Sequence, residues 1–568
     1  MCGATRGSDV RLPKFRIVSL QFELLPLVVG VTGHRDLSAE AEGPLRALFG
    51  EALERLQRRH PSMQLLVLSG LAAGADILAA EEALERGIAV FACLPMPQAE
   101  YEKDFTPAEL ERFRRVLPRC AEVAVVGTSA RREQGYVDVA DFIAYYCHVL
   151  VAFWDGLEAR GPGGTAQVVE LRRGGVPSMV GDALVAYMPD VGPVFQIITP
   201  RRDQPPPAES LSIREIYPER QGWRARSKTA ARRAGEEEFE DALAHVERFN
   251  RDLSREPVST AQNRLAALGD RVDAASNRQQ QKTLRSLRGL YVATALAGAA
   301  QLVLPTDGSF HIPSWAGIAA RVGFLAIAFV VFAVAKRSDY ENRYQDYRAI
   351  AEALRVQYAW CCAGLRNRLV EASYLQMQQS ELAWIRLALR TAYLITGCGI
   401  AQPDDSPSRS ESVRWIDGQV EYYEAAGKRE ETHLHRIERA TVAVAVTGFA
   451  LSAIAFMAGW MMTHHLMPAI IAPPASAQGT LAYWETMPLA LGSMLALIFR
   501  FYAQQRGFNE NARRYQHMFT VFDAAKRRLR EQHGDPRKVL EQLGHEALSE
   551  HAAWLILHRE RPLTFVHT

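Results

Sequence analysis

Residues 26–33 read PLVVGVTG, an apolar run that ends in glycine, and a helical stretch, GPLRALFGEALERLQRR, follows at 43–59. The same order recurs with QLLVLSG at 64–70 and the helix DILAAEEALERG at 76–87. Apolar strands that alternate with helices are typical of a parallel sheet covered by helices on both faces. We therefore predict an α/β Rossmann-like parallel sheet, whose further strands are AVFACLP (89–95), EVAVVG (122–127), VLVAFWDG (149–156) and PVFQIITP (193–200).

Three of these strand ends carry glycines together with polar side chains. Ligands of open parallel sheets bind outside the carboxyl ends of the strands. Glycine permits tight turns there, and the N–H groups of a following helix N-terminus hold a phosphate, to which Arg35 adds a bidentate donor and Thr165 a hydroxyl. The predicted ligand-binding residues are Thr32, Gly33, His34, Arg35, Ser69, Gly70, Gly74, Asp76, Asp155, Gly163, Gly164 and Thr165.

Four motifs in this region resemble the SLOG superfamily. They are GVTGHRDL (30–37), SGLAAGAD (69–76), LPMPQAEYEKDF (94–105), and AFWDG (152–156) followed by GPGGTAQVV (161–169). The superfamily includes cytokinin-activating phosphoribohydrolases, ligand sensors of antiphage systems and the N-terminal domain of melastatin-type channels. The resemblance implies a domain that binds a nucleotide-derived ligand.

The phosphoribohydrolase motif, PGGxGTxxE, is only partly present. The run from Pro162 to Thr165 lacks the inserted xG, the position three after Thr165 is Val168, and Glu170 comes two residues too late. We therefore assign no catalytic residue and expect a sensor that is not an enzyme and needs no cofactor. His34 and Asp76 remain open between acid–base chemistry and hydrogen-bonding or helix-capping roles.

Four apolar segments follow in the second half of the chain, at 289–304, 315–335, 440–462 and 481–502. About 20 residues of helix cross the hydrocarbon core of a bilayer. Because the segments form two close pairs, we predict an α-helical membrane domain with four transmembrane helices in two repeated hairpins. The alternative is that all four are buried helices of a large soluble core.

Two ionisable residues, Arg321 and Glu485, lie inside these segments. Each precedes by 15 residues the basic residue at the end of its segment, Lys336 or Arg500. The two charges are therefore expected at similar depth in the outer part of the bilayer. They either extend to the outer headgroups or pair with each other, lining a shared vestibule.

Basic residues flank the two hairpins but are absent from their connectors, PTDGSFHIPS (305–314) and THHLMPAIIAPPASAQGT (463–480). The positive-inside bias places both connectors outside and the N-terminal and C-terminal domains in the cytosol. The first residues, MCGATRGSDVRLPKFR, lack the apolar core of a signal peptide. We expect a multi-pass protein of the bacterial inner (plasma) membrane, in contact with membrane lipids.

Charge and cysteine content exclude two classes of partner. The formal net charge is only +2, and no basic run with interleaved aromatics is present, so we expect no nucleic-acid polymer. The seven cysteines form no CxxC pair and have no histidine cluster beside them, which predicts reduced thiols and no metal site. They are Cys2, Cys93, Cys120, Cys147, Cys361, Cys362 and Cys398.

The membrane part contains an internal repeat. Glu-Asn at 341–342 matches Glu-Asn at 510–511, and Ser-Glu at 380–381 matches Ser-Glu at 549–550, both at an offset of 169. Constant spacing favours a duplicated unit over chance similarity among Ala- and Arg-rich helices. Each unit resembles the SLATT family, two-transmembrane domains associated with nucleotide-sensing systems in prokaryotic conflict loci. That resemblance, from about residue 260 onward, implies a pore-forming or membrane-disrupting effector.

These patterns divide the chain into four parts: a SLOG-like domain at 1–202, a linker and helical stalk at 203–284, and SLATT-like units at 285–400 and 401–568. We expect a homo-oligomeric membrane effector of antiphage defence that a nucleotide second messenger controls. The alternative functions are a membrane-tethered nucleotide or NAD-derivative hydrolase and a constitutive scaffold or transporter. The chemical fate of the ligand, bound intact or cleaved, discriminates the sensor from the hydrolase.

Overall fold

The computed structural model divides the chain into two compact units. The first comprises Met1–Ala275, Tyr347–Ser412 and Leu540–Ala552, and the second comprises Ser276–Asp346, Val413–Val539 and Ala553–Thr568. The structure describes residues 22–127, 131–158, 163–174, 191–202, 207, 209–219, 228–261, 263–303, 314–365, 370, 383–397, 409–464, 478–531 and 535–559. The N-terminal 21 residues, most of both predicted connectors, most of the Pro-rich segment at 203–210, the repeat marker at 380–381 and the cysteines Cys2 and Cys398 lie outside this description.

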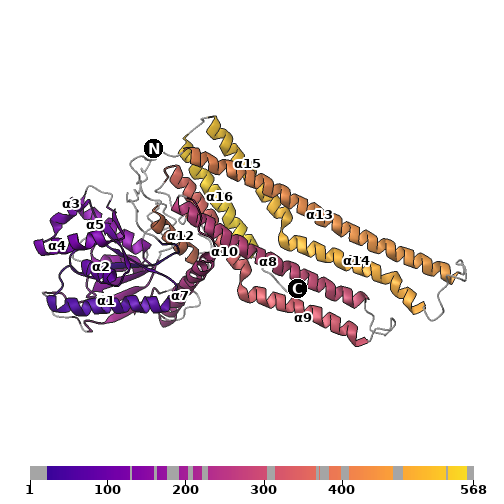
Figure 1. Ribbon diagram of the computed structural model, residues 1–568, viewed down its shortest axis with the longest axis horizontal. Coiled ribbons are helices and arrows are strands. Elements are labelled where there is room, and N and C mark those ends of the chain that lie inside the picture. The colour runs from indigo at the N-terminus through magenta and orange to yellow at the C-terminus, as the bar shows by residue number, and fades with distance from the viewer. Residues whose placement is uncertain are drawn as a thin grey trace, which may run out of the picture. The chain divides into compact units, whose positions relative to one another are not determined.

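The first unit contains a seven-stranded sheet in the order β4-β3-β2-β1-β5-β6-β7 (Figure 1). Neighbouring strands from β4 to β6 are parallel, and β7 pairs antiparallel with β6. The predicted Rossmann-like sheet and its six strands are confirmed, whereas β7 was not predicted. The strands are β1 (Leu27–Gly33), β2 (Leu65–Ser69), β3 (Ala89–Leu94), β4 (Glu122–Val125), β5 (Val149–Trp154), β6 (Val194–Ile198) and β7 (Ile213–Ile216).

Helices account for most of the remaining described chain. Two short 3₁₀ turns, Glu102–Asp104 and Leu117–Arg119, flank α4. The helices are α1 (Ala39–Arg59), α2 (Ala75–Glu85), α3 (Gln98–Tyr101), α4 (Pro107–Val116), α5 (Arg132–Tyr146), α6 (Thr165–Gly174), α7 (Lys228–Leu253), α8 (Arg264–Val303), α9 (Ser314–Ser338), α10 (Tyr340–Cys362), α12 (Ala383–Thr396), α13 (Arg409–Thr463), α14 (Gln478–Arg506), α15 (Phe508–Arg530) and α16 (Pro536–Arg559).

Helices cover both faces of the sheet. The Cα of Gly30 faces α5, because a Cβ there would come within 2.8 Å of Ile143, whereas a Cβ on Gly33 would overlap Ala75 at the start of α2. Successive strand residues point to opposite faces, so these two positions, three residues apart, identify the two sides. Accordingly, α1 and α2 pack on one face, and α5 and α6 pack on the other.

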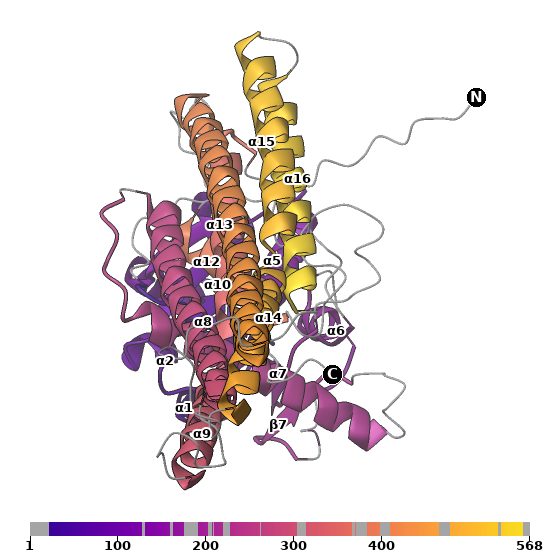
Figure 2. The same cartoon turned by 90° about the vertical axis from the view of Figure 1, so that its right-hand side faces the viewer.

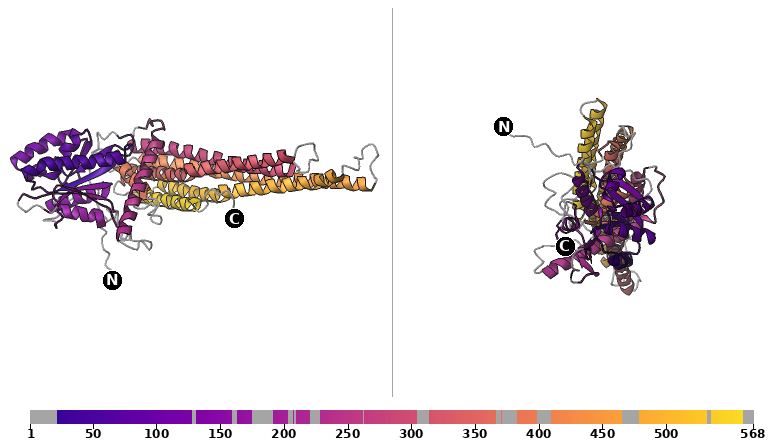
Figure 3. Two further views of the ribbon diagram at one scale, coloured as in Figure 1. Left: turned by 90° about the horizontal axis from the view of Figure 1, so that it is seen from below. Right: turned by 90° about the vertical axis from the view of Figure 1, so that its left-hand side faces the viewer.

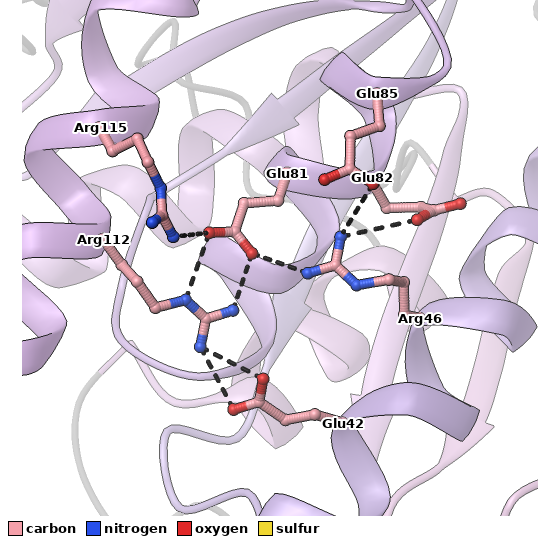
Figure 4. Close-up of polar contacts among 7 residues, drawn as sticks. All are labelled: Glu42, Arg46, Glu81, Glu82, Glu85, Arg112 and Arg115. Carbon is pink, nitrogen blue, oxygen red and sulfur yellow. Dashed lines mark hydrogen bonds and ion pairs between the residues drawn. The ribbon is translucent and has the colours of Figure 1, made fainter.

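An ion network ties α1, α2 and α4 together (Figure 4). The carboxylate of Glu81 on α2 accepts hydrogen bonds at 2.8 Å from Arg46 of α1 and from Arg112 of α4. Arg115 adds a third bond at 3.3 Å, and Arg112 also reaches Glu42 on α1. These arginines lower the pKa of Glu81 to about 2, against the opposing effect of its burial. Glu81 therefore stays ionised, and its carboxylate links α2 to the arginines of α1 and α4.

Two buried arginines hold the C-terminal end of α5. Arg172 of α6 donates to the carbonyl of Ala144 at 3.2 Å, and Arg390 of α12 donates to that of Tyr145 at 2.8 Å. The guanidinium of Arg390 also lies 4.2 Å from the centroid of the Tyr145 ring. Cations are stabilised where the carbonyls of a helix end are exposed. Through these bonds α12, more than 200 residues downstream, becomes part of the α/β unit.

The second unit contains two helical hairpins that run alongside each other (Figures 1 and 3). In the first hairpin, Leu290 and Ala293 of α8 pack against Ala328 of α9. In the second, α13 and α14 approach so closely that a Cβ on Gly448 would come within 2.6 Å of the Pro488 carbonyl oxygen (Figure 2). Close backbone approach at glycine is characteristic of packed membrane helices.

Three helical stretches among the described residues are long and apolar enough to cross a membrane: Trp315–Cys362, Val413–Met461 and Glu485–Arg530. They overlap the second, third and fourth predicted spans, and few of the residues in their apolar windows are buried. This indicates a multi-pass membrane protein. The first predicted span, at 289–304, is not among them because it is short and follows the charged stretch of α8 that contains Arg285 and Arg288.

Each half of the helical part contains a break between two consecutive helices, and the two breaks have the same backbone geometry. Asp339 after α9 has φ +56° and Gly507 after α14 has φ +60°. At each, the N–H bonds to the carbonyl three residues back, at 3.2 and 3.1 Å, and the carbonyl accepts the N–H four residues ahead. The next helices, α10 and α15, both have 23 residues. This agreement, at an offset of 168, supports the duplication inferred from sequence.

The prediction that all cysteines are reduced is wrong for Cys361. That residue is disulfide-bonded, whereas Cys93, Cys120, Cys147 and Cys362 are free. A disulfide needs two cysteines whose Cα atoms are within about 7 Å, and helix packing brings together residues that no CxxC spacing reveals.

Arg321 and Glu485 each contact a residue of their own hairpin. Arg321 on α9 donates a hydrogen bond to the side chain of Gln301 on α8. The Glu485 carboxylate on α14 lies against Gly459 on α13, at a distance that leaves no room for a Cβ. Among the described contacts no ion pair joins Arg321 to Glu485, so pairing of the two charges remains a hypothesis.

Candidate functional site

The sheet has one topological switch point, between β1 and β5. From β1 the chain proceeds through β2, β3 and β4 on one side, and β5 and β6 lie on the other. In doubly wound sheets, the helices that follow the two central strands leave on opposite faces, which opens a crevice at their carboxyl ends. The switch-point cleft found there has a volume of about 600 Å³, within the usual range for small-molecule sites.

Nine of the twelve predicted ligand-binding residues line this cleft, and Ser69, Gly74 and Asp155 do not. The lining comprises Val31, Thr32, Gly33, His34, Arg35, Asp36, Gly70, Ala72, Asp76, Pro95, Tyr101, Tyr136, Val139, Ala140, Ile143, Trp154, Leu157, Glu158, Gly163, Gly164, Thr165, Ala166, Val168 and Arg201. Segments that are more than 100 residues apart in the sequence therefore meet at one edge of the sheet.

The N-terminus of α6 borders the cleft on one side. Gly164 accepts the N–H groups of Gln167 and Val168 at 2.9 and 3.2 Å, and Gly163 donates its own N–H to the Gln167 side chain at 2.8 Å. Gly163 has φ +71°, and a Cβ there would come within 2.8 Å of the backbone of Tyr136. Because helix N-termini carry partial positive charge, this turn is suited to an anionic group.

Arg35 supplies a full positive charge to the same cleft. Its guanidinium lies over the ring of Tyr136, 5.1 Å from the centroid. The Tyr136 hydroxyl in turn donates to the carboxylate of Asp104, which also pairs with Arg132. Arg35 is thus held by an aromatic ring that is itself anchored. A cation held in this way is preorganised for a phosphate.

His34, Asp155 and Arg201 form the polar base of the cleft. The N–H of Asp155 donates to His34 Nε2 at 3.1 Å, and Arg201 pairs with the Asp155 carboxylate at 2.6 Å. Burial lowers the pKa of His34, with the Asp155 carboxylate opposing this effect. The lowered pKa keeps the His34 imidazole neutral at pH 7, and its Nε2 accepts a backbone hydrogen bond. His34 thereby joins the loops after β1 and β5. This arrangement favours a hydrogen-bonding role for His34 over acid–base chemistry.

Asp76 lies at the start of α2 and is almost fully buried, with 8% of its surface exposed. Burial raises its pKa to about 7, although Arg35 and the backbone N–H groups of Ala72 and Gly33 oppose the shift. Ser69 sets the turn before it: its hydroxyl donates to the Asp76 carbonyl and accepts the Leu71 N–H, both at 3.1 Å. Asp76 therefore lines the cleft, whereas Ser69 supports the turn from behind.

Gly74 does not line the cleft, but it sets the backbone conformation of the turn beside it. It caps α2 with φ +84°, and a Cβ there would come within 2.5 Å of the His34 carbonyl oxygen. That carbonyl accepts the Ala75 N–H at 3.1 Å, so the loop after β1 and the start of α2 are tied together.

Tyr101, Tyr136 and Arg201 are among the polar residues of the cleft that were not predicted. Tyr101 lies inside the motif at 94–105, so the SLOG resemblance contained the signal for it. Tyr136 is on α5, and Arg201 follows β6. Neither is marked by a local pattern, because only the fold brings the middle of a helix and a remote strand end to the switch point.

The structure also places the residues relevant to hydrolysis. Val168 lines the cleft, whereas Glu170 is exposed and does not. Two residues along a helix turn a side chain by about 200°, which accounts for the difference. Among the described residues, no group of three histidine, cysteine, aspartate or glutamate side chains is placed to hold a metal ion.

Comparison with known proteins gives one match, to a part of the helical region. No curated protein matches the chain. Residues 271–366 match a family described as "Protein of unknown function (DUF4231)". This stretch contains most of α8 and all of α9 and α10. The chain is therefore similar to this family over its first hairpin and the helix that follows.

Proposed function

We propose that the protein is a membrane effector whose switch-point cleft senses a nucleotide-derived second messenger. The observation that carries the proposal is the composition of the cleft. A preorganised arginine, a helix N-terminus with two glycines and the hydroxyl of Thr165 converge on a cavity of about 600 Å³. These groups match a phosphate, and the remaining volume accommodates a sugar or base. The resemblance of four motifs to the SLOG superfamily supports the same ligand class.

The response is proposed to occur in the bilayer. Three helices have the length and composition to span it, and their exposed faces carry large apolar side chains such as Phe329, Phe449 and Phe456. The resemblance to the SLATT family supports a pore or a local disruption of the membrane by an oligomer, in antiphage defence. Ligand and membrane response are coupled only if the ligand binds two conformations with different affinity.

The sensor function is tested with two variants of the cleft and one control. Arg35→Ala removes the cation, and Gly164→Leu obstructs the approach to the α6 N-terminus. Both should reduce the affinity for co-purifying nucleotides, identified by mass spectrometry, by about 100-fold in calorimetry. Arg58→Ala removes an exposed arginine of α1 and should bind as the native protein does. Unchanged affinity in both cleft variants would contradict the proposal.

A hydrolase is the second candidate, and Asp76 is the observation that favours it. A carboxyl whose pKa is near 7 is suited to general acid–base catalysis at neutral pH. Chromatography of the nucleotide after incubation with the full chain distinguishes the two functions. Release of ribose or base supports hydrolysis, whereas recovery of intact ligand supports sensing.

The effector function is tested separately from ligand binding. Ion flux from liposomes that contain the full chain should rise when the co-purifying nucleotide is added, and Arg35→Ala should abolish the increase. If the nucleotide binds but the ion flux does not change when it is added, a scaffold or transporter would be favoured instead.

A further inference from the structure

Asp76 lines the cleft, and one of its carboxylate oxygens is buried without a hydrogen-bond partner. Among the described residues, its Oδ1 accepts no hydrogen bond, although the atom is shielded from bulk water. Its other oxygen, Oδ2, faces the Cα of Gly70, where a Cβ would come within 3.1 Å. Leaving a buried acceptor unpaired costs about 1–3 kcal/mol, more for a charged group. Asp76 therefore combines an unfilled acceptor with a position in the wall of a cavity of about 600 Å³.

The groups around Asp76 are engaged elsewhere. Arg35 stacks on Tyr136, 5.1 Å from the ring centroid. The Tyr101 hydroxyl donates to the Gly70 carbonyl at 3.1 Å, and the Cys93 thiol donates weakly to the Phe91 carbonyl at 3.8 Å. Arg35, Tyr101 and Cys93 are the charged and titratable groups that act electrostatically on Asp76 or feel its charge. None of them fills the Oδ1 position.

We propose that Asp76 accepts a hydrogen bond from a hydroxyl or amino group of the ligand, and so selects ligands that carry such a donor apart from their phosphate. An ionised carboxylate only accepts hydrogen bonds, so it discriminates against carbonyl or ether oxygens at the same position. A ribose hydroxyl and the exocyclic amine of a base share this chemistry. The inference rests on the proposed function, in which Arg35 and the α6 N-terminus hold the phosphate.

The proposal predicts the sign of a pH dependence. The pKa of Asp76 is about 7 in the empty cleft, raised by burial. A donor from the ligand stabilises the ionised form, so its binding lowers that pKa and releases a proton near neutrality. A phosphate monoester also loses a proton at about pH 6, so the test is the difference in affinity between two phosphate-bearing ligands that differ by one donor. That difference should rise between pH 6 and pH 8. A ligand that presents an acceptor to a protonated Asp76 would give the opposite slope.

The experiment compares phosphate-bearing probes that differ by one donor. Ribose 5-phosphate and 2-deoxyribose 5-phosphate test a hydroxyl, and adenosine and inosine monophosphates test an amine. Inorganic phosphate serves as the probe of the anion site alone. With the full chain in nanodiscs at pH 8, calorimetry should show about tenfold tighter binding for the donor-bearing member of at least one pair. Which pair responds identifies the donor.

Two variants and a matched control separate the role of Asp76 from general damage. Asp76→Ala should abolish the discrimination while leaving the affinity for inorganic phosphate within about twofold. Asp76→Asn keeps an acceptor but cannot titrate, so the difference in affinity within a pair of probes should become independent of pH. Asp141→Asn removes another carboxyl of raised pKa, about 6, from a position outside the cleft lining. It should behave as the native protein does.

The outcomes distinguish this inference from the function on which it rests. If the native protein binds inorganic phosphate and the probes without discrimination at any pH, the role of Asp76 is overturned and the anion site remains. If no phosphate-bearing probe binds at any pH, the proposed function itself is overturned. The pH profile of the native protein needs no variant, so the inference stays testable even if Asp76→Ala does not fold.

Discussion

Single glycines set the shape of the cleft, and Gly163 is one of them. Its left-handed backbone, with φ +71°, is disfavoured for any other residue, and the Tyr136 backbone occupies the space that a Cβ would need. Gly163→Ala should therefore lower stability by more than the roughly 1 kcal/mol cost of the backbone conformation alone. It should also weaken phosphate binding, because the α6 N-terminus must shift.

Gly87→Ala is the matched control for Gly163. Gly87 has φ +72°, but nothing lies within 4 Å of the position of a Cβ. Its substitution carries the conformational cost without a collision and should leave phosphate binding unchanged. Thermal unfolding and calorimetry of both variants in the full chain provide the comparison, and equal effects in the two would refute the steric argument.

At this scale the sequence identified the cleft residues that lie in the turns after strands. Thr32 and Gly33 at the end of β1, and Gly164 before α6, could be named because glycine and small polar residues at strand ends and helix starts are typical of ligand-binding turns. Tyr136 and Arg201 could not, because their neighbours in the chain carry no such signal. Asp155 was predicted to bind the ligand, yet it pairs with Arg201 behind the cleft lining. The local sequence does not show how far from the cleft surface a side chain lies.

Among the elements, α1, α2 and α4 depend on one carboxylate. The pKa of Glu81 is about 2 in the folded protein, below its ordinary value of 4.5. A lowered pKa means that the stabilisation is complete above about pH 4.5 and is lost as the pH falls toward 2. Glu81→Gln should therefore destabilise this region by about 2 kcal/mol at pH 7, and by less than half of that at pH 3.

Hydrogen exchange of the α2 amides in the full chain measures this effect at both pH values. Glu85→Gln is the control, since Glu85 lies on the same helix, is 59% exposed and pairs with Arg46 at 3.5 Å. Exposed pairs contribute little, so its effect should stay below about 0.5 kcal/mol. A Glu81 effect that is the same at pH 3 and pH 7 would show that packing, not charge, is responsible.

The elements were predicted unequally well, for a physical reason. Strands β1, β2, β3, β5 and β6 are almost fully buried, and continuous apolar runs mark buried parallel strands clearly. Strand β7, IREI, is an antiparallel edge strand with one exposed and three half-buried residues, and it has no such run. It lies in the segment predicted to be a linker. Its pairing with β6 is a tertiary contact that composition does not reveal.

For the molecule as a whole, the close crossing of α13 and α14 is open to a direct test. Gly448→Ala places a Cβ within 2.6 Å of the Pro488 carbonyl oxygen and within 3.1 Å of Gly492. The helices must separate, which should lower the midpoint of thermal unfolding in detergent by about 5 °C. Gly323→Ala on α9 is the control, because nothing lies within 4 Å of the new methyl group. Equal midpoints for the two variants would exclude tight packing there.

Membrane topology is a second whole-molecule prediction. In a chain without its native cysteines, a cysteine introduced at 306–311 or 472–477 should react with an impermeant reagent applied to intact cells. A cysteine in place of exposed Arg58 on α1 should not react until the cells are opened. The expectation follows from the absence of Lys and Arg in both connectors. Labelling at position 58 in intact cells would reverse the inferred orientation.

Three of the four spans predicted from hydropathy overlap helices of the described chain that are long and apolar enough to cross a membrane, and the remaining one does not. Residues 289–304 lie in α8, a 40-residue helix whose earlier part is polar. A window there includes charges, so composition alone does not separate a span from the end of a soluble helix. The break between helices at Asp339 and at Gly507 is a stronger argument than hydropathy for two equivalent hairpins. The backbone geometry is the same at both positions although the residues differ.

The length of α13 has a mechanical consequence. Its 55 residues form one uninterrupted helix about 80 Å long at 1.5 Å per residue. A bilayer core uses about 30 Å of that length, so some 50 Å extends into water as a lever arm. Tyr423 and Trp415 stiffen this arm by packing against Phe522 of α15. Turning the arm by about 5° displaces its far end by about 4 Å, the scale of one side-chain repacking step.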